Sequence, residues 1–83
     1  MSQYLIMCRS LTYAQRASRL LERAGMTALV IKAPQQLTGN GCGYAVSIRK
    51  NVEAAVGVLR SANAPFGKIY VRDESGRYSE VKV

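Results

Sequence analysis

The sequence predicts a single α+β domain spanning residues 1–83, and two observations support this class. The first is an internal repeat: residues 20–25 (Leu-Leu-Glu-Arg-Ala-Gly) correspond to residues 58–63 (Val-Leu-Arg-Ser-Ala-Asn), 38 positions later. The second is that each copy belongs to an amphipathic helix standing between two short apolar runs. Two successive strand–helix–strand units are typical of the ferredoxin-like split βαβ (βαββαβ) fold. We therefore expect a four-stranded antiparallel sheet with strands one and three in the centre and two helices on one face.

The first strand–helix–strand unit begins with residues 4–8, a short apolar run that indicates a strand. Thr12 followed by Gln15 has the spacing of a capping box and predicts the start of a helix. Apolar side chains then recur at helical spacing, at Ala14, Ala17, Leu20, Leu21 and Ala24. Gly25 predicts the end of this helix, because glycine adopts the left-handed conformation cheaply. Residues 27–32 predict the second strand.

The second unit follows a predicted loop at residues 34–41, which carry turn formers and almost no apolar side chain. In the next strand Tyr44, Val46 and Ile48 alternate onto one face. Gly57 weakens the second helix and indicates close packing against a neighbour. The expected elements are a strand at 43–48, a helix from about residue 51 that ends at 63–65, a strand at 68–72, a turn at 73–76, and a return of residues 77–83 as a C-terminal edge strand.

Charge and composition exclude most enzyme classes. The chain has 12 Lys and Arg against 5 Asp and Glu, a net charge of +7, and contains no His and no Trp. Without His there is no Ser-His or Cys-His nucleophile pair and no His-containing zinc site. Two cysteines do not complete a four-cysteine metal site. We therefore expect a protein that is not an enzyme and that needs no metal and no cofactor.

The N-terminal residues carry no positive charge ahead of their apolar run, so no signal peptide is expected. That run is far shorter than the ~18 apolar residues of a membrane-spanning helix. The C-terminal residues carry no lipidation motif. We expect a cytoplasmic protein without a membrane partner, in which both cysteines are reduced thiols.

Cys8 and Cys42 are predicted to share one edge of the sheet. In an antiparallel pair the end of strand one lies beside the start of strand three, so their Cα atoms should lie within roughly 5–12 Å. The first helix opens at the same edge, and its N–H groups at Thr12 and Tyr13 favour an anion. Arg9 adds a positive charge. Such surroundings stabilise a thiolate.

Cys42 is the stronger candidate for a reactive thiol, because Gly41 and Gly43 flank it and are expected to leave its thiol accessible. Two interpretations stay open for each cysteine. Cys42 is either an acceptor thiol or a small residue at the start of a strand. Cys8 is either a core residue or a resolving thiol that forms a disulfide, or shares a soft metal ion, with Cys42.

Three features of the chain resemble the small bacterial family of selenium/sulfur (Se/S) carrier-like proteins. They are the strand–helix–strand start, the Pro-x-x-Leu-Thr motif at residues 34–38 and the Cys-Gly-x-Ala element at residues 42–45. The resemblance covers residues 4–70 and implies that Cys42 carries sulfur or selenium as a persulfide or selenosulfide. It also implies donor and acceptor proteins as partners. The tail at residues 73–83 and the excess positive charge are departures from the family pattern.

Two other function classes stay open. Residues 43–45 (Gly-Tyr-Ala) are similar to part of the third-strand motif of RNA-recognition domains, although Cys42 stands where that motif has a basic residue. Tyr4 and Tyr44 would then be the stacking rings. Weak, sequence-independent nucleic-acid binding would use the basic side chains of Arg16, Arg19, Arg23, Lys32, Arg49, Lys50 and Arg60. The alternative is a regulatory or interaction domain that forms a homodimer through its sheet face or edge, because strand one is apolar on both sides.

Overall fold

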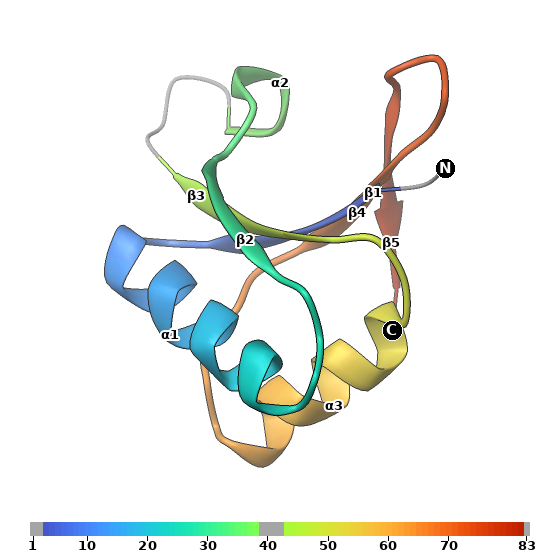
Figure 1. Ribbon diagram of the computed structural model, residues 1–83. Helices are drawn as coiled ribbons and strands as arrows, with labels where there is room; N and C mark the ends of the chain where they lie inside the picture. Colours follow the sequence, from blue (N-terminus) through green and yellow to red (C-terminus); the bar gives the residue numbers. More distant parts are fainter. Residues whose placement is uncertain (1–2, 39–42, 83) are drawn as a thin grey trace.

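Five antiparallel strands form one sheet in the computed structural model, which describes residues 3–38 and 43–82 (Figure 1). The order of strands across the sheet is β2-β3-β1-β4-β5. The expected α+β class is confirmed. The sheet has five strands where a four-stranded sheet was expected, and the fifth is the C-terminal edge strand expected within residues 77–83. The elements are β1 (Gln3–Cys8), α1 (Leu11–Arg23), β2 (Leu29–Lys32), α2 (Gln35–Thr38), β3 (Tyr44–Ile48), α3 (Val52–Ser61), β4 (Ile69–Arg72) and β5 (Tyr78–Val81).

β1 is the central strand and pairs with β3 on one side and β4 on the other. Its register with β3 runs from Tyr4 opposite Ile48 to Cys8 opposite Tyr44. The prediction that strands one and three are antiparallel neighbours is therefore confirmed. β5 extends the sheet beyond β4, after a turn in which the Asp73 carboxylate accepts hydrogen bonds from the backbone N–H groups of Ser75 and Arg77.

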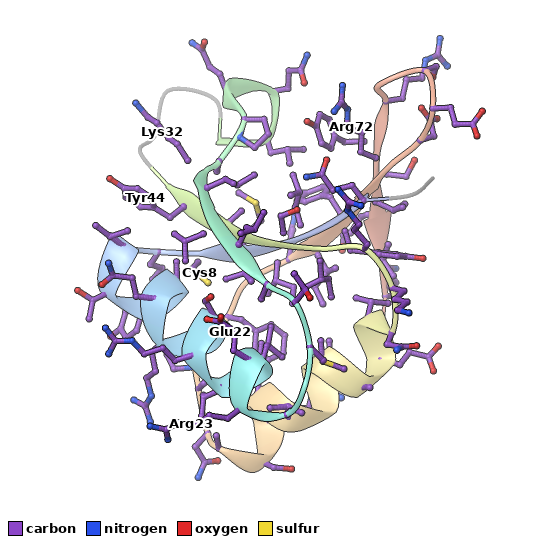
Figure 2. The ribbon with its side chains drawn as sticks, in the orientation of Figure 1. Cys8, Glu22, Arg23, Lys32, Tyr44 and Arg72 are labelled. Atoms are coloured by element: carbon purple, nitrogen blue, oxygen red, sulfur yellow. The ribbon has the colours of Figure 1, made fainter. Side chains whose placement is uncertain are left out.

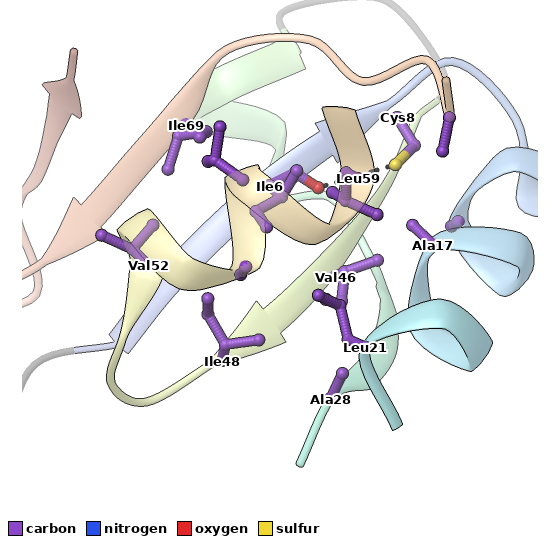
Figure 3. Close-up of a cluster of buried hydrophobic side chains, with 14 residues drawn as sticks. Ile6, Cys8, Ala17, Leu21, Ala28, Val46, Ile48, Val52, Leu59 and Ile69 are labelled. Atoms are coloured by element: carbon purple, nitrogen blue, oxygen red, sulfur yellow. Dashed lines mark hydrogen bonds between the residues drawn. The ribbon is translucent and has the colours of Figure 1, made fainter. Parts of the chain in front are cut away.

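The main core lies between the sheet and helices α1 and α3, which cover the same face (Figure 1). Ile6 from β1 and Val46 from β3 are fully buried there. Leu21 from α1 and Leu59 from α3 pack on them (Figure 3). The alternation predicted for the third strand is confirmed, since Val46 and Ile48 belong to this core whereas Ala45 belongs to a cluster on the other face.

A second, smaller cluster covers the sheet face opposite α1 and α3. Leu5, Ala33 and Ala45 are buried in it, and Met7, Ile31, Leu37 and Tyr78 pack around them. Leu37 comes from the short helix α2, which lies across the sheet from α1 and α3 (Figure 1). The prediction of a loop throughout residues 34–41 was therefore wrong for Gln35–Thr38. A third helix forms there and contributes an apolar side chain to this face.

The two main helices end in the same way. α1 has its C-cap at Ala24 and is followed by Gly25 at φ 85°, and α3 has its C-cap at Ala62 and is followed by Asn63 at φ 54°. Both helices thus end in a left-handed residue, 38 positions apart, as the internal repeat implies. The repeat does not extend to the strands. Ile31 faces the second cluster, whereas Ile69, its counterpart in the repeat, faces the main core.

Two local predictions were wrong. α1 begins at Leu11 with Ser10 as its N-cap, so Thr12 lies inside the first turn and is not the cap. Gly57 marks no close approach, because a Cβ at this position would have nothing within 4 Å. Within the described residues, none of the helices has the length and the hydropathy needed to cross a membrane.

Because the second cluster is buried, we expect that shortening one of its β1 side chains destabilises the domain. Leu5→Ala removes a side chain that is 1% exposed, and we expect it to lower the free energy of unfolding by about 2–5 kcal/mol. Leu29→Ala is the matched control, because Leu29 is 63% exposed and its loss should cost about 0.5 kcal/mol or less. Urea denaturation of both variants measures the difference. Equal losses would show that this face is not a packed core.

Candidate functional site

Three segments meet at the end of β1. The strand ends at Cys8, α1 begins three residues later, and Cys8 pairs with Tyr44, the first residue of β3. Gly43 lies at the same end of the sheet, where its carbonyl accepts a hydrogen bond from the N–H of Ala33 at 3.0 Å. The shared edge predicted for Cys8 and the start of strand three is therefore present. Gly41 and Cys42 lie outside the described residues, so the Cys8–Cys42 distance stays a prediction.

Cys8 is a core residue in this structure. It is 6% exposed and belongs to the main core cluster between the sheet and the helices (Figures 2 and 3). Its thiol donates a weak hydrogen bond to the carbonyl of Ile6, with an Sγ–O distance of 3.8 Å. Burial raises the pKa of Cys8 from 9.0 to about 11, because desolvation disfavours the thiolate. At pH 7 roughly one Cys8 side chain in 10⁴ is therefore ionised.

The start of α1 is only partly available to an anion. The Ser10 hydroxyl accepts a hydrogen bond from the N–H of Tyr13 at 3.3 Å. The N–H of Tyr13, one of the two groups expected to face a thiolate, is thus already engaged by the cap. Thr12 is exposed in the first turn, and Arg9 is exposed between β1 and the helix. Both residues lie at the sheet edge where the sequence placed them, although Thr12 is in the first turn and is not the cap.

A hollow of about 490 Å³ opens at this end of the sheet, beside β1 and toward β4. Tyr13 and Arg9 line it from the start of α1, and Phe66 lines it from the segment that leads into β4. The remaining lining residues are Met7, Cys8, Pro65 and Gly67. Pro65, Phe66 and Gly67 were not predicted as site residues from the sequence. The available signal was topological: a strand beside β1 and antiparallel to it must begin at the edge where β1 ends.

The features expected of a nucleic-acid surface are present only in part. Tyr4 and Tyr44 pack against the core between the sheet and the helices, so neither ring is displayed on the opposite face as a stacking platform. The seven basic side chains proposed for phosphate contact are all exposed. They lie on different elements, however: three on α1, one on β2, two between β3 and α3, and one on α3.

No group of three His, Cys, Asp or Glu side chains that could hold a metal ion occurs in residues 3–38 and 43–82. A metal ion shared between Cys8 and Cys42, as considered from the sequence, stays a prediction, because Cys42 lies outside the described residues. The described groups at this end of the sheet are a neutral buried thiol, an exposed arginine and two aromatic rings, which lie around the hollow.

The chain matches the sequence profile of one protein family over residues 3–71, and the description of that family is "Putative Se/S carrier protein-like". No significant similarity was found among curated proteins or among solved structures. The matched residues include Cys8 and Cys42 and extend from β1 into β4, whereas the turn at residues 73–76 and β5 lie beyond them. This chain therefore belongs to the Se/S carrier protein-like family.

Proposed function

We propose that this protein carries sulfur or selenium on the thiol of Cys42 and passes it between a donor and an acceptor protein. The observation that supports this most is the family match, which spans 69 residues from 3 to 71 and includes Cys42. The chain has two cysteines, and burial keeps Cys8 protonated near neutral pH. Cys42 is then the thiol left for exchange. The supporting fold is a ferredoxin-like βαββαβ core, to which β5 is added.

The transfer step is a redox-neutral exchange. The Cys42 thiolate attacks the outer sulfur of a donor persulfide, so a new S–S bond forms on Cys42 and the S–S bond of the donor breaks. The donor thiolate leaves and takes up a proton. A donor that carries selenium in the outer position reacts in the same way and leaves a selenosulfide on Cys42. The exchange needs an accessible thiolate but no general base and no cofactor.

Arg9 and the first turn of α1 are the proposed stabilisers of this thiolate. Gly43, the chain neighbour of Cys42, lies at the end of the sheet where Arg9 and α1 stand. A positive side chain and free helical N–H groups favour the thiolate over the thiol. Thr12 is the better placed of the two residues first expected, because the N–H of Tyr13 is bonded to Ser10. We propose Cys8 as a resolving thiol only for conditions that open the core.

A cytoplasmic homodimer remains part of the proposal. Reduced thiols fit the cytoplasm. The support for a dimer is that β2 is an edge strand on which Leu29 is 63% exposed, and exposed apolar edges favour pairing with another chain. The net charge of +7 on each copy opposes association, so a dimer would be expected to strengthen as salt increases.

Loading of Cys42 is the direct test of the carrier function. After incubation with a small-molecule persulfide, we expect the Cys42 peptide to gain about 32 Da by mass spectrometry. Cys8→Ala should gain the same mass, since its remaining thiol is the proposed acceptor, whereas Cys42→Ser should gain none. Circular dichroism of each variant checks the fold. A gain on the Cys8 peptide, or none on either, would contradict the proposal.

Alkylation rates test the division of roles between the two cysteines. In the folded protein at pH 7 we expect iodoacetamide to modify Cys42 at least ~100-fold faster than Cys8. About one Cys8 in 10⁴ is thiolate, against a few per cent for an ordinary exposed thiol. The rate at Cys8 should rise as the pH approaches its pKa of about 11. Unfolding in guanidinium chloride is the control and should bring the two rates together. Similar rates in the folded state would remove the basis for choosing Cys42.

Nucleic-acid binding is expected to be weak and purely electrostatic. We predict that binding to a single-stranded oligo-uridylate, measured by fluorescence anisotropy, is lost between about 50 and 200 mM salt. Tyr44→Leu should leave the affinity unchanged because its ring packs toward the helices, whereas Arg16→Gln with Arg19→Gln should weaken it. A salt-resistant complex that depends on Tyr44 would favour an RNA-binding function instead.

A further inference from the structure

The hollow beside the end of β1 has the size of a small-molecule site. Its volume of about 490 Å³ lies within the range of about 300–1,000 Å³ that is typical of ligand pockets. Its lining has an apolar part and a polar part. Met7, Pro65 and Phe66 supply apolar surface, and Arg9 and Tyr13 supply polar groups. Among residues 3–38 and 43–82, none that lines the hollow is acidic.

Backbone hydrogen bonds hold the two sides of this hollow together without a ligand. The N–H of Gly67 donates to the carbonyl of Met7 at 2.7 Å, and the N–H of Met7 donates to the carbonyl of Lys68 at 2.9 Å. Phe66 is therefore attached to a segment that is paired with β1. A Cβ at Gly67 would lie 3.4 Å from the Met7 carbonyl oxygen, so the two backbones approach closely here. The hollow is preformed, which reduces the entropy lost on binding.

The Arg9 guanidinium group and the Tyr13 hydroxyl are the polar side-chain groups at the hollow that remain available to a ligand. Arg9 is exposed and forms no ion pair within the described part of the chain, and the Tyr13 hydroxyl forms no hydrogen bond there. A guanidinium group is a fixed positive charge with several N–H donors, and it pairs well with carboxylate, sulfonate or phosphate oxygens. An aromatic or alkyl body of a ligand would lie on Phe66 and Met7 and lose its contact with water.

We propose that this hollow binds a small organic anion, with its apolar or aromatic body against Phe66 and its anionic group at Arg9. The apolar lining selects against small hydrated ions such as inorganic phosphate, and the positive charge selects against neutral or cationic ligands of the same shape. The proposal is argued from the described lining residues alone and does not rest on the carrier function.

Two probes of the same ring system test the proposal: 1-naphthalenesulfonate and the neutral 1-naphthalenemethanol. In ¹H–¹⁵N NMR titrations we expect sulfonate-induced shifts at the backbone amides of Met7, Cys8, Arg9, Phe66 and Gly67. Arg9→Gln should raise the Kd of the sulfonate about tenfold, because a charge-assisted contact is lost, and leave the neutral alcohol unaffected. Phe66→Ala should weaken both probes.

Arg49→Gln is the matched control, since Arg49 is an exposed arginine that follows β3 at the other end of that strand. It should leave the Kd of the sulfonate unchanged. Equal effects of Arg9→Gln and Arg49→Gln, shifts centred on the α1 arginines, or no saturation up to about 10 mM probe would each overturn the proposal. Cys42→Ser should bind the sulfonate with unchanged Kd while losing persulfide loading, so a failure of either proposal is recognised separately.

Discussion

The burial of β1 on both of its faces is the constraint on which this domain depends. Ile6 is 0% exposed beneath α1 and α3, and the adjacent residue Leu5 is 1% exposed on the opposite face. A strand that is apolar on both sides must be covered on both sides. The two main helices cover one face. The other is covered by side chains from β2, α2 and β5, so these elements, as well as the two main helices, are needed to bury β1.

The same constraint explains why Cys8 and Arg9, which are adjacent at the end of β1, differ in their exposure to solvent. Cys8 continues the inward-facing series of β1, so its sulfur lies in the core and its pKa rises to about 11. Arg9 leaves the sheet and is exposed, because the chain must turn there to start α1. A buried neutral thiol and an exposed guanidinium group therefore occupy neighbouring positions in the sequence. The hollow lies at the point where the buried side chain of Cys8 is followed by the exposed side chain of Arg9.

The order of strands and helices could be predicted from sequence because it depends on local patterns. Alternation marked β3, helical spacing marked α1 and α3, and Gly25 marked the end of α1. The remaining features depend on contacts between distant residues. Ser10 replaces Thr12 as the cap because α1 begins at Leu11 and the Ser10 hydroxyl accepts a hydrogen bond from the N–H of Tyr13. α2 forms where Leu37 meets the second cluster. The hollow joins Arg9 to Phe66, 57 positions apart in the sequence, and no local pattern reports such a contact.

The position of β1 in the chain has a consequence for how the protein folds. β1 precedes both of its partners, which are residues 44–48 in β3 and residues 69–72 in β4. The pairing of β1 is complete only when about 70 residues of chain are available, because one of its two partners is β4. Sheets made of such distant pairings form slowly, and an unpaired apolar strand is prone to aggregate in the meantime. During synthesis on the ribosome, β1 is the segment that a chaperone would have most reason to bind.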